Sequence, residues 1–300
     1  MFKDLLVPLD GSTLAEAAIP IAVELSHKLK ASVTLLHVIE KNAPQEIHGQ
    51  RHLTDEASAK TYLENIAATC FKSTQKINIH VHTEEVSQVA RSIVEHSGEF
   101  APDLIILCAH GEGGLHDFVV GSIPQQVIAE GSIPVLLLQA REGDESRKSL
   151  IKCIVVALDG DPVHDASLHV ASDLALAIGA QLHLIRVVPT LGTLNAEHAA
   201  TGTLLPVTTN AILDLTEDEA VKYLDNQLDF LREKGLEASA EVERGDPAQE
   251  VVKSATNQHA DMIVLGTHGK KGMGALWAGS VAPMIVARTQ LPILLIPVRR

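Results

Sequence analysis

Aromatic residues are scarce in this sequence: five Phe, two Tyr and one Trp make up 3% of its 300 residues. The hydrophobic residues, 46% of the chain, are therefore mostly Val, Ile, Leu and Ala. Cores built from aliphatic side chains suit parallel sheets that helices cover on both faces. The length is enough for two domains, each able to bury a core of its own.

Basic residues are outnumbered, with 24 Lys and Arg against 38 Asp and Glu, and the net charge is -14. Binding to DNA or RNA requires a basic surface, so we expect no nucleic-acid partner, although a small anion can still bind locally. The sequence also lacks an apolar run of about 18 residues, the length that spans a bilayer. Its start, "MFKDLLVPLD", is too short and too charged for an export signal. We therefore expect a cytoplasmic protein that does not bind membranes.

Cysteine is rare as well. The three residues Cys70, Cys108 and Cys153 have neither the spacing of a metal site nor that of a redox pair. Their number is odd, so the sequence predicts buried thiols in a reducing compartment.

The chain contains an internal repeat. "LVPLDGS" at residues 6–12 matches "VVALDGD" at residues 155–161, so that Asp10 and Asp159 lie 149 positions apart. "PDLIILCAHG" at residues 102–111 matches "ADMIVLGTHG" at residues 260–269, which is 158 positions away. One net insertion of nine residues explains the change of offset. We therefore predict two copies of one domain, over residues 1–140 and 150–300, joined by a polar linker at residues 141–149.

Strands and helices alternate in each copy. In the first copy we expect strands at residues 4–9, 32–39, 78–84, 104–108 and 134–138, and helices at residues 13–29, 55–74, 88–99 and 123–130. The spacing of Thr13 and Glu16 is typical of a capping box at the start of the first helix. This alternation predicts the α/β class, with a parallel sheet, right-handed crossovers and helices on both faces.

The longest insertion lies between Pro189 and Leu215 in the second copy. It is poor in charge, rich in small residues and Thr, and shows no clear periodicity. A segment of this kind is either a lid or partner-binding segment or a flap without function.

Four histidines raise the question of a metal. His80 and His82 lie on one face of a predicted strand, and His110 and His268 lie within two glycine-rich segments. A zinc site needs three or four converging ligands, and no spacing in the sequence predicts such a set. The sequence therefore predicts no metal held by side chains, and a divalent ion carried by a phosphate ligand is the alternative.

The glycine-rich segment of the second copy indicates a ligand site. Ligands of open parallel sheets bind beyond the carboxyl ends of the strands. Asp159 follows the first strand there, and Gly266, Gly269, Gly279 and Ser280 follow the fourth. Glycines allow close approach of a ligand to the backbone, and the start of a helix attracts phosphate. The phosphate-binding loop G-x-x-x-x-G-K-[ST] and the dinucleotide motif G-x-G-x-x-G after a first strand are both missing.

The spacing G-x2-G-x9-G-[ST], together with the strands "VALD" and "LIRVV", the turn "GDP" at residues 245–247 and the ending "LPILLIPV", resembles the universal stress protein family. The likeness extends over nearly the whole chain, once in each half. It implies two doubly wound domains, each with five parallel strands in the order 3-2-1-4-5. It also implies pairing through the last strands of the two halves, an intrachain pseudo-dimer, and the possibility of a homodimer.

The resemblance further implies an adenine nucleotide, ATP or AMP, with Mg or Mn on its phosphates. Asp159 would hold the nucleoside, the main chain at Val187 would meet the base, and the glycines and Ser280 would cradle the phosphates. The nucleotide-binding residues implied are Ala157, Asp159, Val187, Gly266, His268, Gly269, Gly279, Ser280 and Val281.

The first copy departs from this pattern. Cys108 replaces the first glycine, "SQV" at residues 87–89 replaces "GDP", and Glu112 and Asp117 stand where the second copy has Lys270 and Lys271. Acidic side chains repel a polyphosphate, so we expect weak binding or none in this copy. The residues that remain for a second site are Asp10, Val38, Gly111, Gly121 and Ser122.

Three functions stay open at this point. The first is a nucleotide-binding regulatory protein of the stress response, with a protein partner that the sequence does not name. The second is a slow ATPase or a phosphoryl- or adenylyl-transfer enzyme, against which the sequence offers no convincing general base or catalytic residue. The third is a binding module for another small molecule.

Overall fold

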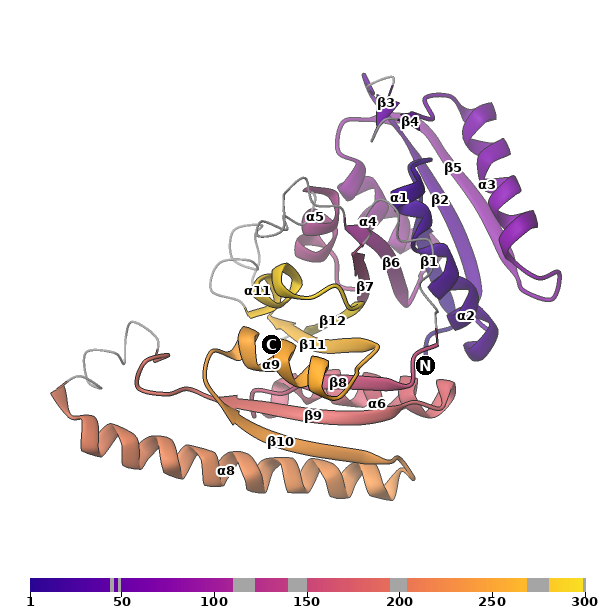
Figure 1. Ribbon diagram of the computed structural model, residues 1–300. Helices are drawn as coiled ribbons and strands as arrows, with labels where there is room; N and C mark the ends of the chain where they lie inside the picture. The colour runs from indigo at the N-terminus through magenta and orange to yellow at the C-terminus, as the bar shows by residue number, and fades with distance from the viewer. Residues whose placement is uncertain are drawn as a thin grey trace. The chain divides into compact units, whose positions relative to one another are not determined.

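The computed structural model describes residues 1–43, 46–47, 50–109, 122–139, 150–194, 204–268 and 281–298 (Figure 1). Contacts between residues divide the chain into two compact units. Unit 1 comprises Met1–Leu150 and most of the last strand, Pro292–Pro297. Unit 2 contains Ile151–His268 and the helix that begins at Val281.

Unit 1 contains the first copy of the repeat. Its elements in chain order are β1 (Asp4–Pro8), α1 (Thr13–Glu16), α2 (Ile19–Leu29), β2 (Ser32–Glu40), β3 (Glu46–Ile47), β4 (Gln50–Arg51), α3 (Glu56–Cys70), β5 (Ile77–Val86), α4 (Val89–Phe100), β6 (Leu104–Ala109), α5 (Ser122–Glu130) and β7 (Val135–Gln139). The strands β5, β2, β1, β6 and β7 lie side by side in that order, and all four pairings are parallel. Counted along the repeat this is the order 3-2-1-4-5, as the family resemblance implies.

The last strand of the chain, β12 (Ile293–Val298), extends this sheet. It pairs antiparallel with β7, so that Ile293 lies opposite Leu137 and Leu295 opposite Val135. Both strands are aliphatic and almost wholly buried, which favours a central rather than an edge position.

The helices of unit 1 form two pairs. Helix α2 packs with α3, and α4 packs with α5. Right-handed crossovers require this arrangement, because the chain passes from β5 back across the sheet to β6 and so changes faces. The strand β5 is the outer strand of the sheet, and α4 follows it directly.

Unit 2 contains the second copy. Its elements in chain order are β8 (Cys153–Ala157), the 3-10 helix η1 (Pro162–Asp165), α6 (Ala166–Ile178), β9 (Gln181–Val188), α8 (Pro206–Glu233), β10 (Ala238–Arg244), α9 (Pro247–Asn257), β11 (Met262–His268) and α11 (Val281–Arg288). The strand order β10-β9-β8-β11 is parallel throughout and repeats the order 3-2-1-4 of unit 1.

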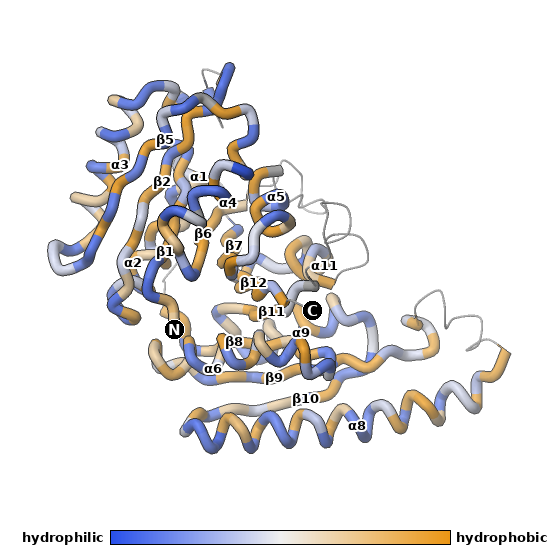
Figure 2. The backbone as a smooth tube through the Cα atoms, turned by 180° about the vertical axis from the view of Figure 1, so that it is seen from behind, coloured by the Kyte–Doolittle hydropathy of each residue, from blue (hydrophilic) through white to orange (hydrophobic). Residues whose placement is uncertain are grey.

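The cores of both units consist of aliphatic strands. Every residue of β2 except Glu40 is buried, and β6 and β7 are buried along their whole length. Figure 2 shows these strands as largely hydrophobic, and α8 as alternating between hydrophobic and hydrophilic residues along its length. Each fully buried Leu, Ile or Val contributes about 1.5–3 kcal/mol to folding, which suffices without aromatic residues.

The helix predicted over residues 13–29 is wrong, because the structure has two helices there, α1 and α2, with a turn at residues 17–18. Pro20 lies in the first turn of α2. Inside a continuous helix this proline would lack the N–H that bonds the carbonyl of residue 16, and its ring would collide with that carbonyl. A new helix that begins just before Pro20 avoids both costs.

The predicted cap at Thr13 is also displaced by one residue. Ser12 is the N-cap of α1, and its hydroxyl accepts a hydrogen bond from the N–H of Ala15 at 3.2 Å. Glu16 therefore serves another purpose, since its carboxylate accepts a hydrogen bond from the hydroxyl of Tyr62 at 3.0 Å.

The prediction of an irregular segment between Pro189 and Leu215 is wrong for its last ten residues. Residues 206–215 form the first turns of α8, which is 28 residues long. Thr209, Leu213, Ala220 and Leu224 are buried along one side of this helix. The periodicity was hidden because the helix buries only a narrow stripe against β9 and β10.

No helix in the described part of the chain is both long enough and apolar enough to cross a membrane.

Candidate functional site

A pocket of about 860 Å³ lies in unit 2 at the carboxyl ends of β8, β9 and β11. The first turns of α9 and α11 close it, through Pro247 and Val251 on one helix and Val281 and Ala282 on the other. The remaining lining residues are Ala157, Leu158, Asp159, His164, Ile185, Val187, Leu265, Gly266 and Ile285. An apolar pocket with few polar groups at this edge of a sheet is typical of small-molecule sites.

Five of the residues predicted from sequence lie together in this pocket: Ala157, Asp159, Val187, Gly266 and Val281. His268 ends β11, but the structure does not describe its side chain. Gly269, Gly279 and Ser280 lie outside the described residues, as do Lys270 and Lys271. The structure therefore describes the residues that we expect to contact a base and a sugar, but not the loop that we expect to contact the phosphates.

Asp159 is held by two hydrogen bonds. Its Oδ1 accepts from the backbone N–H of Asp161 at 2.9 Å, and its Oδ2 lies 2.5 Å from Nδ1 of His164. The carboxylate is half-exposed, whereas the imidazole is buried. These contacts fix the orientation of Asp159 at the pocket while leaving it open to a ligand.

Sequence reasoning missed His164. Its position depends on η1, which begins after Asp161 caps the N–H of Val163 at 3.0 Å and which turns the chain so that residue 164 faces back onto residue 159. A lone histidine five residues after an aspartate carries no signal of its own, so only the turn brings the two together.

Two glycines of unit 2 differ in how strictly their surroundings require glycine. Gly160 has φ of +84°, and a Cβ there would meet the guanidinium of Arg186 at 2.5 Å. Gly266 has no such backbone constraint, but a Cβ there would lie 3.3 Å from Val298 and 3.7 Å from His164. A larger side chain at Gly266 would therefore have to grow into the pocket.

Unit 1 has an equivalent pocket of about 690 Å³. Asp10, Val38 and Cys108 line it at the positions of Asp159, Val187 and Gly266. Ser122 begins α5, but its side chain is not described, and Gly111 and Gly121 lie outside the described residues, as do Glu112 and Asp117. Two further residues of this pocket, Glu40 and His52, have no counterpart in the sequence prediction.

The two pockets differ in charge and in how the aspartate is held. Glu40 gives the first pocket a second carboxylate, while Asp159 is the only acidic residue among the described residues that line the second. Asp10 accepts hydrogen bonds from the N–H and hydroxyl of Ser12 at 2.9 and 2.7 Å, and no histidine takes part in these bonds. The first pocket is therefore less suited to an anion.

The cysteine prediction holds for one residue of three. Cys108 is buried, but Cys70 is exposed at the end of α3 and Cys153 is half-buried. Burial raises the pKa of the Cys153 thiol, and the nearby carboxylate of Asp261 raises it further. The expectation of uniformly buried thiols fails at Cys70 because α3 ends there, four residues before its predicted end.

A parallel α/β sheet with a pocket at the carboxyl ends of its strands defines a class of proteins that bind small molecules there, and this chain contains two such units. The sequence profile of the universal stress protein family matches residues 1–139 and again residues 151–297. The chain belongs to the universal stress protein family and contains two of its domains in tandem.

Individual relatives agree with this assignment. A universal stress protein of Mycolicibacterium smegmatis is 22% identical over 305 aligned residues, which cover 97% of this chain and 96% of the relative. One from Methanocaldococcus jannaschii is 30% identical over 152 residues, covering 50% of this chain and 84% of its own.

Solved structures show the same fold. A universal stress protein from Archaeoglobus fulgidus has a TM-score of 0.67 with 16% identity, covering 99% of this chain and 98% of its own. A putative universal stress protein from Pseudomonas aeruginosa has a TM-score of 0.69 with 17% identity, covering 99% and 93%. A universal stress protein in complex with cAMP covers 50% of this chain at a TM-score of 0.36 and 18% identity, too distant to assign that ligand here.

Proposed function

We propose that this protein is a regulatory member of its family that binds an adenine nucleotide, ATP or AMP, in the pocket of unit 2. The observation that carries the proposal is that five residues from four separate segments, Ala157, Asp159, Val187, Gly266 and Val281, line one pocket. The resemblance of the glycine motif to that of the family supports the same ligand.

The chemistry of the pocket fits the two ends of a nucleotide. Apolar side chains of Leu158, Ile185 and Val251 can cover a base, and the carboxylate of Asp159 can accept hydrogen bonds from a ribose. The helix α11 begins at the pocket, so its first N–H groups and positive dipole end favour phosphate. Gly269, Gly279 and Ser280 would complete the phosphate site, with Mg or Mn on the phosphates.

The pocket of unit 1 is proposed to bind nucleotide weakly or not at all. Cys108 stands where unit 2 has Gly266, and Asp10 and Glu40 place two carboxylates in a smaller pocket. Two close unit charges cost about 1 kcal/mol even in water, so a polyphosphate is disfavoured.

One observation bears on the alternative of a slow ATPase. The pair of Asp159 and His164 has the form of a carboxylate that orients a histidine base. However, Nε2 of His164 is buried, so it does not face a water molecule in the pocket. The pair therefore supports orientation of the ligand rather than proton transfer.

Titration of the full chain with ATP and with AMP tests the proposal. Trp277 is the only tryptophan of the chain and lies in sequence between Gly269 and Gly279, so its fluorescence is a suitable signal. In Gly266→Val the added methyl groups must enter the pocket, and we expect the affinity to fall roughly 10- to 100-fold.

The matched control is Gly98→Val, since a Cβ at Gly98 meets no atom within 4 Å. Equal affinity of Gly266→Val and wild type would refute this site. Mass spectrometry of the ligand that co-purifies distinguishes a nucleotide from another small molecule. Release of phosphate at steady turnover rates would favour the enzyme.

We propose that regulation acts through residues 189–215 and a protein partner in the cytoplasm. The two domains would form an intrachain pseudo-dimer, and two chains could pair again as a homodimer. Saturating nucleotide should slow hydrogen exchange in the first turns of α8. Unchanged exchange there would argue against a switch.

A further inference from the structure

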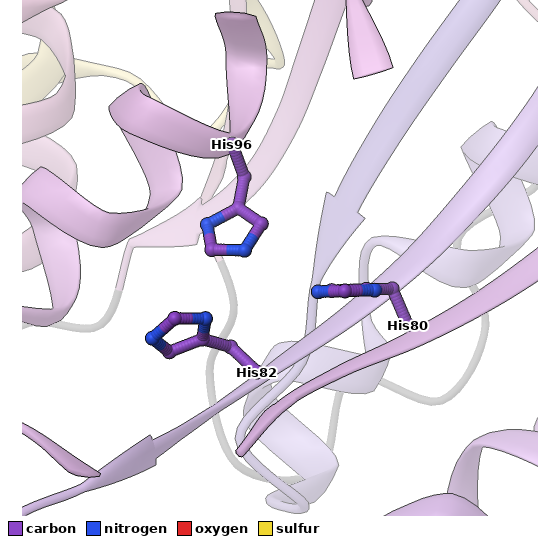
Figure 3. Close-up of side chains that lie close together, drawn as sticks. All are labelled: His80, His82 and His96. Atoms are coloured by element: carbon purple, nitrogen blue, oxygen red, sulfur yellow. The ribbon is translucent and has the colours of Figure 1, made fainter. Parts of the chain in front are cut away.

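Three histidines of unit 1 come together between the outer strand and its neighbouring helix (Figure 3). His80 and His82 lie two residues apart on β5, so both side chains point to the same face of the sheet. His96 lies on α4, and its ring faces the other two. One ring nitrogen from each residue lies within 4.8 Å of those from the other two.

We propose that His80, His82 and His96 bind a divalent transition-metal ion, with Zn²⁺ as the expected ion. Imidazole nitrogen is a preferred ligand of zinc, at about 2.0–2.1 Å, which places the ligand atoms of a tetrahedral site about 3.3 Å apart. The nitrogens here need to approach each other by at most about 1.5 Å. Rotation of the side chains about their χ angles supplies such a movement without a change of the backbone.

The hydrogen bonds of His96 prepare it as a ligand. Its Nδ1 lies 2.8 Å from the carbonyl oxygen of Ser92, one turn earlier in α4. A carbonyl can only accept, so Nδ1 carries the proton and Nε2 presents a lone pair. A metal-binding histidine typically has its second nitrogen fixed to a backbone carbonyl in this way.

One ring nitrogen of His80 is buried and needs a partner. Among the described residues, no group forms a hydrogen bond with the Nε2 atom of His80. Burial lowers the pKa of this imidazole, and the neighbouring His96 and His82 lower it further, while Glu99 raises it. Buried polar atoms are almost always paired, and a metal ion would supply the missing partner.

A fourth ligand is available at the open side of the cluster. A carboxylate oxygen of Glu99 lies 3.8 Å from Nε2 of His96, close to the separation of two ligands on one tetrahedral ion. The side chain of Glu99 is largely exposed, so either this carboxylate or a water molecule can complete the coordination.

Unit 2 provides an internal comparison. Leu36 of β2 lies opposite His80, and Ile185, its equivalent 149 positions later, lies opposite Glu241. There Glu241 accepts a hydrogen bond from Ser254 of α9 at 2.5 Å and lies 3.1 Å from Nε2 of His183. The same place in the fold therefore holds a carboxylate that is hydrogen-bonded to Ser254 in unit 2, whereas in unit 1 it holds one of three neighbouring imidazoles.

A bound metal ion would link β5 to α4, because side chains of both elements would coordinate it. The strand β5 has only β2 as a partner among the described strands, and α4 contributes Val89 and Ile93 to the wall of the first pocket. An ion bound by both elements would hold that wall in place. This differs from the nucleotide site of unit 2, so either proposal can fail without the other.

The test uses the full chain without a polyhistidine tag, stripped of metal with EDTA. Titration with Zn²⁺ against a chromophoric chelator should show one tight equivalent, and Co²⁺ should give the strong visible absorption of a four-coordinate site. His80→Gln, His82→Gln and His96→Gln should each weaken binding roughly 100-fold or more, since even residues that only support metal ligands change affinity 10- to 100-fold.

His27→Gln is the control, because His27 is exposed on α2, and it should bind Zn²⁺ as wild type does. The proposal is overturned if wild type binds no tighter than a variant that carries all three substitutions, or if His27→Gln weakens binding equally. Melting curves in EDTA show whether each variant folds. If one does not, imidazole ¹⁵N NMR of wild type decides, because Zn²⁺ should shift three of the fifteen histidines and no others.

Discussion

At the scale of single residues, equivalent positions of the two units have acquired different partners. Asp159 is oriented by His164, while Asp10 is held by Ser12. We expect these neighbours to make the two pockets differ in affinity.

Glu241 allows a residue-scale prediction about pH. Burial raises the pKa of its carboxyl, but the hydrogen bond from Ser254 and the proximity of His183 and Lys253 outweigh burial, so the net pKa lies below the usual value of 4.5. A carboxyl with a lowered pKa stabilises the folded state above its unfolded pKa, and this stability is lost as the pH falls through the folded pKa.

Glu241→Gln should therefore lower the free energy of unfolding by about 1.5–3 kcal/mol at pH 7, the value of a hydrogen bond to a charged group. The difference from wild type should shrink below pH 4.5 as the carboxyl of the wild type becomes protonated. Urea unfolding at pH 7 and near pH 3.5 measures both. A difference that stays constant with pH would contradict the assigned role of the charge.

At the scale of elements, α8 shows how a helix can be held by a narrow stripe. Its buried residues Leu213, Ala220, Leu224 and Leu231 recur at intervals of four and seven, and the other sides are largely exposed. Asp214 and Glu217 near its start form ion pairs with Arg244 of β10. The side chain of Arg244 is about one third exposed, so we expect the apolar stripe to provide most of the stability.

Leu224→Ala and Val221→Ala test this difference within one helix. The side chain of Leu224 is 2% exposed and that of Val221 is 45% exposed. We expect Leu224→Ala to lower the free energy of unfolding by about 2–5 kcal/mol, because it leaves a cavity. The control Val221→Ala should change it by about 0.5 kcal/mol or less. Equal losses in chemical denaturation would show that α8 is not anchored by its stripe.

At the scale of the whole molecule, one chain carries two copies of a fold whose pockets have different lining residues. The C-terminal strand β12 pairs with β7, so the end of the second copy is part of the sheet of unit 1. This pairing is the reason we propose an intrachain pseudo-dimer. It also means that deletion of the C-terminal strand should disturb unit 1.

A bound nucleotide should stabilise unit 2 more than unit 1. At 100 times its Kd, a ligand that binds only the folded form adds about 2.7 kcal/mol to the stability of the unit that binds it. We expect ATP to raise the protection from hydrogen exchange in β8, β9 and β11, and to leave β1, β2 and β6 unchanged. Equal protection of both sets of strands would contradict the assignment of the nucleotide to unit 2.

Much of the site could be predicted from sequence, because its residues follow strands that are easily recognised. Asp159 comes directly after β8 and Gly266 lies near the end of β11, and parallel strands bring their carboxyl ends to one edge. His164 and Glu40 were missed because no pattern marks them. The place of His164 depends on the 3-10 helix η1. The place of Glu40 depends on where β2 ends relative to the pocket.

The sequence by itself determined the repeat, the alternation of strands and helices, and the edge of the sheet at which a ligand would bind. These follow from hydrophobic patterns and chain direction, which are local properties. Only the tertiary structure decided that His96 of α4 meets His80 and His82 of β5. Contacts of this kind depend on how separate elements pack, and side-chain packing leaves no periodic trace in the sequence.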